Sequence, residues 1–182
     1  MTQPSPASQK RKMAAALTRS AMLAALYAAL TLLSSLLGLS YGPLQLRLAE
    51  ALCLLPFFYP EASIGLFVGC LAANLLSPYG ILDLVFGSLA TLVAALWSRR
   101  MPRLWLAALP PVVCNMLLVG AVITLEETGL SPAFAPLFFY HALTIGAGEA
   151  VVCFGIGVPL LRFWEKRKKE RKGLDKSESR HL

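Results

Sequence analysis

The middle of this sequence has very little charge. Of its 182 residues, 57% are hydrophobic and 15% are charged, whereas a soluble domain carries about 25% charged residues. Fifteen of the 27 charged side chains lie in residues 1–12 and 165–182, so the 152 residues between them hold only 12. An apolar stretch this long excludes a globular interior and predicts an integral membrane protein.

Several motifs of self-sufficient enzymes and pumps are missing. The chain has no G-x-x-x-x-G-K-[ST] loop, so it cannot energise itself with a nucleotide. It has no H-E-x-x-H motif. Asp83 is the only aspartate in the apolar region, and intramembrane aspartyl proteases need two. The sequence therefore predicts a protein that is not an enzyme and has no cofactor.

The chain has few cysteines, and their spacing does not match a metal or redox motif. Cys53, Cys70, Cys114 and Cys153 all lie in apolar segments, and no two of them form a C-x-x-C. A metal site needs convergent ligands at a defined spacing. We expect these residues to be small, reduced, buried hydrophobes, and we expect no metal.

Six apolar segments separated by turn residues predict an all-α bundle of six transmembrane helices (13–164) between tails at 1–12 and 165–182. The second tail is expected to be frayed. Gly, Pro and Ser mark the breaks between the segments, which we place at 13–37, 44–58, 62–76, 81–98, 104–125 and 136–164.

The positions of the basic residues support six spans. With both termini cytoplasmic, 16 of the 17 Lys and Arg residues fall on the cytoplasmic side, in agreement with the positive-inside rule. One span fewer would move the cluster at 99–103 and the basic tail to the opposite side from the N-terminus. The basic excess thus reflects topology and contact with anionic lipid rather than nucleic acid.

The seventeenth basic residue, Arg47, belongs to a set of polar residues in the outer halves of the predicted spans. An ionised group at this depth costs about 2.5–3.5 kcal/mol, so the four ionisable members, Arg47, Glu50, Asp83 and Glu149, would together cost roughly 10 kcal/mol facing lipid. They must pair, hydrate or line a cavity. The candidate ligand-binding residues are Arg47, Glu50, Asn74, Tyr79, Asp83, Asn115, His141 and Glu149.

Two interpretations of this set remain open. Arg47 and Glu50, three residues apart, can form a buried pair, while Asn74 and Asn115 join helices by hydrogen bonds. An outward-open, acidic pocket explains the whole set better, because one cation cannot neutralise three acids. Such a pocket suits a ligand with several hydrogen-bonding edges, with Tyr79 and Tyr140 near its mouth.

The first segment carries small residues and no charge between Ala21 and Ser34. Ala21, Ala25 and Ala29 repeat every four residues, and such stripes allow two helices to approach closely. The stripe either packs inside this bundle or docks another membrane subunit.

Three stretches of the sequence resemble the QueT family: R-L-A-E-A-L-C-L-L-P-F-F at 47–58, G-L-F-V-G-C-L-A-A-N at 65–74 and L-D-L-V-F-G-S-L-A-T at 82–91. Members are substrate-binding (S) components of energy-coupling factor (ECF) transporters, a class of ABC importer. The resemblance implies a six-helix protein of the bacterial plasma membrane that captures a queuosine precursor, a deazaguanine base or queuine, from outside. It also implies docking through the alanine stripe to a transmembrane coupling (T) subunit joined to two cytosolic ATPases, whose ATP hydrolysis drives reorientation and release.

Other functions fit the same residues. An S component for another vitamin or purine-like micronutrient would have the same fold. A solitary cation-coupled carrier would use Glu149 and His141 as a proton relay. A passive channel is disfavoured, because the inner halves of the predicted helices are apolar.

Overall fold

The computed structural model describes residues 5–40 and 45–178, and of Lys169 and residues 171–178 it describes only the backbone. These described residues form helices and turns and contain no strand, which confirms the all-α prediction. Six continuous helical runs follow the order of the predicted segments: α1 (Pro6–Leu36); η1 (Leu48–Phe57); α2 (Ala62–Asn74); α3, η2 and α4 (Gly80–Leu82, Asp83–Gly87, Ser88–Ser98); η3, α5, η4 and α6 (Leu106–Ala108, Leu109–Cys114, Asn115–Val119, Gly120–Thr128); and α7, η5 and α8 (Phe134–Ala150, Val151–Gly157, Val158–Glu178).

Four of these runs are long and apolar enough to cross a membrane, by length and composition. They are Pro6–Leu36, Gly80–Ser98, Leu106–Thr128 and Phe134–Lys168. The two shorter apolar helices, Leu48–Phe57 and Ala62–Asn74, fall below that length. The chain is therefore an all-α, multi-pass membrane protein.

The terminal helices extend further than the sequence suggested. Helix α1 begins at Pro6, because the Ser5 hydroxyl accepts a hydrogen bond from the Ser8 backbone N–H at 3.3 Å and proline occupies the first turn. The prediction of a frayed C-terminal tail is wrong as far as Glu178, because α8 continues to that residue. Lys, Arg and Glu are good helix formers, so a charged run can prolong a helix beyond the membrane.

The second segment is the main departure from the prediction. It was expected to be a span over 44–58; residue 44 lies outside the described residues, and the helix begins at Leu48 as a 3₁₀ helix of ten residues that contains Pro56. Runs of 3₁₀ helix longer than four residues are uncommon. Residues 49–56 are all buried, so η1 lies at the centre of the bundle.

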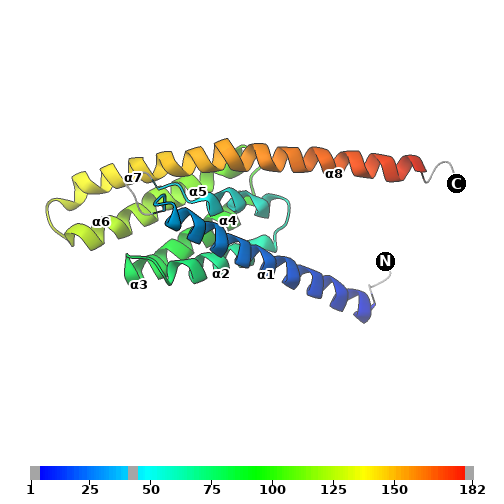
Figure 1. Ribbon diagram of the computed structural model, residues 1–182, viewed down its shortest axis with the longest axis horizontal. Helices are drawn as coiled ribbons and strands as arrows, with labels where there is room; N and C mark the ends of the chain where they lie inside the picture. The colour runs from blue at the N-terminus through cyan, green and yellow to red at the C-terminus, as the bar shows by residue number, and fades with distance from the viewer. Residues whose placement is uncertain (1–4, 41–44, 179–182) are drawn as a thin grey trace.

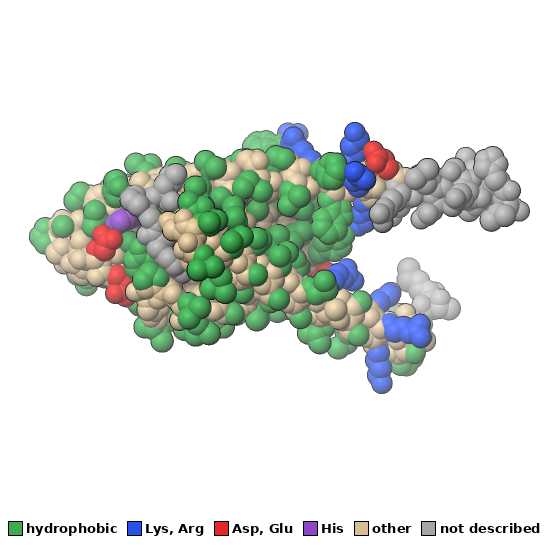
Figure 2. All heavy atoms as spheres, in the orientation of Figure 1, with side chains coloured by type: hydrophobic (Ala, Val, Ile, Leu, Met, Phe, Trp, Pro, Cys, Tyr) green, Lys and Arg blue, Asp and Glu red, His purple; other side chains and the backbone are tan. Residues whose placement is uncertain are grey.

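Charge is arranged along the long axis of the molecule. The start of α1 and the end of α8 lie at one end, and α3 and the turn between α6 and α7 lie at the other (Figure 1). Lys and Arg side chains gather at the first end, hydrophobic side chains cover the belt between, and acidic side chains and histidine appear at the opposite end (Figure 2). This order is typical of a protein that sits across a bilayer.

Helices α1 and α2 pack through small residues. A Cβ on Gly65 would lie 2.4 Å from the Ser20 carbonyl oxygen, and a Cβ on Gly69 would lie 2.6 Å from the Ala24 carbonyl oxygen. Only glycine allows the two backbones to approach this closely. The contact face of α1 thus contains Ser20, Ala24 and the fully buried Tyr27.

Candidate functional site

Six of the predicted ligand-binding residues are buried inside the bundle. Membrane-embedded polar groups need partners to offset the cost of removing them from water. The residues, with their exposed fractions, are Arg47 (4%), Glu50 (1%), Asn74 (2%), Asp83 (0%), Asn115 (3%) and Glu149 (2%). We refer to these six as the polar cluster.

Arg47 joins η1 to η2 through Asp83. Arg47 occupies the N-cap position of η1 with extended backbone angles, and its Nη2 lies 3.6 Å from Asp83 Oδ2. The Ser77 hydroxyl donates to the same Asp83 oxygen at 2.6 Å. The pairing predicted from spacing was with Glu50, whereas the ion pair in the structure joins Arg47 to Asp83 on another helix, so the charge of Asp83 is offset by a buried cation.

Asn74 and Asp83 each keep one oxygen without a protein donor. The Asn74 amide nitrogen donates to the Asp83 backbone carbonyl at 3.1 Å and to the Ser88 hydroxyl at 3.4 Å. Within the part of the chain that the structure describes, Asn74 Oδ1 and Asp83 Oδ1 accept no hydrogen bond. Two buried acceptors of this kind can receive N–H groups from a ligand.

Gly87 makes room for these two side chains. A Cβ at position 87 would lie 2.4 Å from Asp83 Oδ1 and 2.9 Å from the Asn74 amide nitrogen. No other residue type fits there without displacing the polar groups.

Glu50 is held by α1 and by its own helix. The Tyr27 hydroxyl donates to Glu50 Oε1, and the Cys53 thiol donates to Glu50 Oε2 at 3.0 Å. The Ser34 hydroxyl accepts the Leu48 backbone N–H at 3.1 Å, which satisfies a free donor at the start of η1. Helix α1 therefore fixes both the start of η1 and its buried acid.

Glu149 and Asn115 form a second hydrogen-bonded pair within the polar cluster. The Asn115 amide nitrogen donates to Glu149 Oε1 at 2.9 Å. The Cys153 thiol lies 3.9 Å from Glu149 Oε2 and 3.7 Å from the Glu50 carbonyl oxygen, so it lies between the two acidic residues. Gly148 permits this arrangement, because a Cβ there would lie 2.0 Å from the Gln45 carbonyl oxygen, just before Arg47.

Three π-helical segments coincide with the polar cluster. Segment η2 begins at Asp83, η4 begins at Asn115, and η5 begins two residues after Glu149. Single π turns within α-helices are rare and occur frequently at functional sites. A π turn is wider than an α turn, so it rotates the side chains that follow it. All three π-helical segments lie next to members of the polar cluster.

His141 and Tyr140 lie towards the surface, and Tyr79 reaches the polar cluster through Ser77, whose hydroxyl accepts the Tyr79 backbone N–H at 3.3 Å and donates to Asp83. His141 Nε2 lies 3.1 Å from Glu127 Oε2, joining α7 to the end of α6. Tyr140 is 50% exposed. Tyr79 is partly buried and packs against a second apolar core around Ala90 and Ile123.

The predicted alanine stripe lies on the outside of the bundle. Ala21, Ala25 and Ala29 are all exposed. They lie beside other exposed apolar residues of α1, including Met22 (67%) and Leu26 (45%). The small residues that pack α1 onto α2 are Ser20 and Ala24, not members of the stripe.

Sequence reasoning missed several partners of the polar cluster. Tyr27 and Ser77 carry ordinary hydroxyl groups, and only the fold places them next to Glu50 and Asp83. All four cysteines are free and buried, as predicted. Cys53 and Cys153, however, also donate their thiol hydrogens to acids of the polar cluster. The sequence predicts only an apolar packing role for them.

Two hollows of the described residues do not coincide with the expected outward-open pocket. One such hollow lies along the start of α1 and another lies between η1 and α8, and neither is lined by the polar cluster. The cluster residues instead contact one another. Among the side chains that the structure describes, no group of three or more His, Cys, Asp or Glu is placed to hold a metal ion.

The chain resembles known proteins over most of its helical region. The family model described as QueT transporter matches residues 17–166. The chain is also similar to a protein named queuosine precursor transporter QueT, from Lactococcus lactis subsp. cremoris (strain MG1363), with 41% identity over 73 residues. That match covers 40% of this chain and 43% of the relative, less than half of either. No solved structure matches the chain.

Proposed function

This chain belongs to the QueT transporter family, and on that premise we propose that it is a membrane-embedded substrate-binding component that captures a queuosine precursor. The name of the relative from Lactococcus lactis supports a ligand of this class. The observation that carries the proposal is the polar cluster, in which four helical runs and η1 bring together three acids, one cation and two amides in an apolar bundle.

The hydrogen-bonding groups of the polar cluster suit a deazaguanine base. Such a base donates through its ring N–H and exocyclic amine and accepts through its oxo group. Within the polar cluster, Asn74 Oδ1 and Asp83 Oδ1 accept no hydrogen bond from the described residues, and we assign them to the donor edge of the base. Asn115 and Glu149 form the second polar pair, and we assign them to the other end of the ligand.

The charge of the polar cluster favours a ligand with a positive group. Glu50, Asp83 and Glu149 are buried with Arg47 as their nearby cation, and Arg47 lies against Asp83. Glu50 and Glu149 lie on either side of Cys153. A protonated amine, such as the one in the aminomethyl form of the precursor, would offset this excess of negative charge.

Binding requires the polar cluster to open. Its members contact one another, so the bundle must separate η1 from α7 or α4 before a planar ring can enter. We propose entry at the end that carries α3 and the turn between α6 and α7, under residues 126–136. Figure 1 places that end away from both termini.

The proposal includes separate partner subunits. The sequence lacks a phosphate-binding loop for ATP, so an ECF-type coupling subunit and two ATPases would supply the energy. The exposed stripe of Ala21, Ala25 and Ala29 offers the docking face. We further propose six spans, with η1 and α2 as the two short ones, and cytoplasmic termini in a bacterial plasma membrane.

Ligand binding to the purified protein tests the proposal. We expect Asp83→Asn and Glu149→Gln each to weaken binding of the aminomethyl deazaguanine base by at least about tenfold, since a buried charged hydrogen bond is worth about 1.5–3 kcal/mol. Calorimetry in detergent measures the affinity. Glu127→Gln removes an exposed acid outside the polar cluster, so its affinity should stay within about twofold of the wild type.

Unchanged affinity in both cluster variants would contradict the assignment of the site. Mass spectrometry of small molecules that co-purify with the protein tests the ligand class separately. Uptake by the reconstituted protein alone, without any ATPase, would contradict the dependence on partner subunits.

A further inference from the structure

The end of the molecule that holds both termini carries most of the basic side chains (Figure 2). Two helices project from this end, the first turns of α1 and the continuation of α8 (Figure 1). The cations with described side chains on these two helices are Lys10, Arg11, Lys12, Arg19, Arg162, Lys166, Arg167 and Lys168. They exceed the acids described nearby, Glu61, Glu165 and Glu170.

Tyr59 brings cations from both helices to one point. Lys168 of α8 donates to the Tyr59 hydroxyl at 3.2 Å, and its Nζ lies 5.1 Å from the centre of the ring. The guanidinium carbon of Arg19, on α1, lies 5.8 Å from the same ring centre. Arg19 also pairs with Glu61, Nη1 to Oε1 at 3.1 Å, and donates its Nε hydrogen to the Ala15 carbonyl at 3.2 Å, so its remaining N–H groups are the ones open to a further acceptor. Cation–aromatic contacts of this kind hold positive groups at a membrane surface. Tyr59 therefore joins two basic helices that are distant in sequence.

The same point borders the apolar belt. A small hollow of about 30 Å³ between η1 and α8 is lined by apolar side chains and by two charged residues of α8, Glu165 and Lys168. The apolar members are Leu55, Phe58, Tyr59, Leu161 and Trp164. On the outer side of α8, Leu160 is 50% exposed and Phe163 is 58% exposed, so this surface faces the hydrocarbon of the bilayer.

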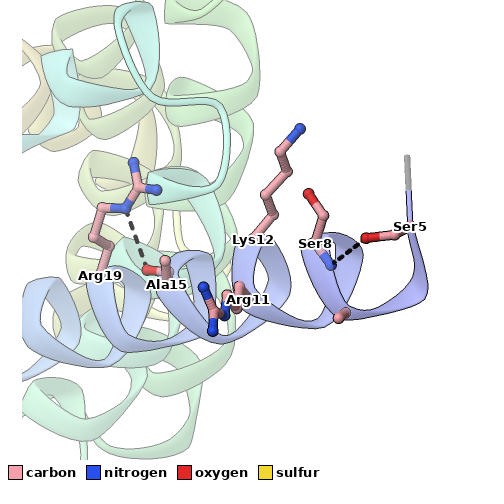
Figure 3. A pocket seen from close by; sticks show the side chains of 7 residues that line it. Ser5, Ser8, Arg11, Lys12, Ala15 and Arg19 are labelled. Carbon is pink, nitrogen blue, oxygen red and sulfur yellow. Dashed lines mark hydrogen bonds between the residues drawn. The ribbon is translucent and has the colours of Figure 1, made fainter. Parts of the chain in front are cut away.

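The start of α1 adds a second basic surface. A shallow, open hollow of about 550 Å³ lies along this helix. In Figure 3, the side chains of Ser8, Lys12 and Arg19 point to the same side of α1. Arg19 lines this hollow and also reaches Tyr59, so the two surfaces are continuous.

We propose that Arg19, Tyr59 and Lys168 form a binding site for the phosphate of an anionic phospholipid in the adjoining leaflet. The phosphodiester accepts hydrogen bonds from Lys168, Arg19 and the Tyr59 hydroxyl. One acyl chain lies against Phe58, Leu161 and Trp164. The contiguous apolar surface favours a lipid over a soluble phosphate, because a soluble anion gains nothing from it.

Native mass spectrometry of the full-length protein with phosphatidylglycerol or phosphatidylcholine tests the site. We expect the wild type to bind phosphatidylglycerol at least about tenfold more tightly than phosphatidylcholine. The double variant R19Q/K168Q should lose about fivefold in affinity for each removed charge. The matched control R99Q/R103Q removes two cations from the same basic end, between α4 and η3, and should stay within about twofold of the wild type.

A charge-preserving variant, R19K/K168R, separates binding from folding. Its affinity for phosphatidylglycerol should stay within about threefold of the wild type. Equal binding of both lipids by the wild type would overturn the site, as would an equal loss in the control R99Q/R103Q. A loss in R19K/K168R as large as in R19Q/K168Q would assign the effect to damaged packing and overturn it too. An unchanged lipid affinity in R19Q/K168Q would also overturn the site.

Discussion

Gly148 is the single residue on which the closeness of η1 and α7 most depends. It places the Gln45 backbone against α7, and from there Arg47 and Glu50 reach the region of Glu149. Gly155, seven residues later in η5, has no atom within 4 Å of the position of an added Cβ. The two glycines thus lie on one helical run in opposite environments.

We expect Gly148→Ala to destabilise the protein by about 1–3 kcal/mol, because the new methyl group overlaps a backbone oxygen and forces η1 away. Ligand affinity should fall together with stability. Gly155→Ala should change stability by less than about 0.5 kcal/mol. Thermal unfolding in detergent compares the two variants, and equal melting temperatures would show that the Gln45 contact is not needed.

The residues of the polar cluster could be predicted from the sequence, but their partners could not. Arg47, Glu50, Asp83 and Glu149 are conspicuous because ionisable groups are costly inside a bilayer. Spacing along one helix suggested only a local pair for Arg47, whereas its partner Asp83 lies 36 residues away. His141 is also ionisable, but its partner is Glu127 near the surface, and composition does not reveal that difference.

At the scale of elements, α1 has two faces with different roles. One face packs on α2 through close backbone contacts at Gly65 and Gly69. The other exposes Ala21, Ala25 and Ala29. Small residues occur on both faces, so the sequence alone left internal packing and external docking as equal alternatives.

We expect Ala25→Leu to leave folding and ligand affinity unchanged but to lower uptake in cells by at least about tenfold, because a larger side chain blocks close approach of a partner helix. Val93→Phe adds similar bulk to an exposed position on α4 and should leave uptake unchanged. Ligand uptake with all partner subunits present measures both variants. Full activity of Ala25→Leu would rule out the stripe as the docking face.

Gly69→Ala provides the complementary test of the inner face. The added methyl group would lie 2.6 Å from the Ala24 carbonyl oxygen, so we expect a loss of stability of about 1–3 kcal/mol. Thermal unfolding of the purified protein checks this. A stability equal to that of the wild type would show that α1 and α2 tolerate a wider separation.

Helix positions could be predicted better than helix types and ends. Each predicted apolar segment overlaps one helical run, since hydrophobicity follows the bilayer. The 3₁₀ form of η1 could not be foreseen, because its eight buried residues are packed by neighbours on several helices. The ends were missed at Pro6 and Glu178 because hydrophobicity stops where the membrane stops, while helical hydrogen bonding continues.

At the scale of the whole molecule, the basic end and the acidic end should face opposite sides of the membrane. Leu130, 92% exposed, lies between α6 and α7. Gln9 and Arg100 are exposed on α1 and after α4. The native cysteines are at most 7% exposed, so a new surface cysteine can be labelled with little background.

We expect an impermeant maleimide to label Leu130→Cys in intact cells, and to label Gln9→Cys and Arg100→Cys only after the membrane is permeabilised, since basic segments stay in the cytoplasm. The unsubstituted protein is the control for background. Labelling of Gln9→Cys and Arg100→Cys on opposite sides would contradict an even number of crossings between them.

The contact between Arg47 and Asp83 also has a consequence during synthesis. The ribosome produces Arg47 before Asp83, so the emerging chain holds the guanidinium before this buried partner has been made. We therefore expect η1, which contains Glu50 and begins next to Arg47, to stay at the translocon until the hairpin that carries Asp83 arrives. On this expectation, insertion of the protein does not proceed strictly one helix at a time.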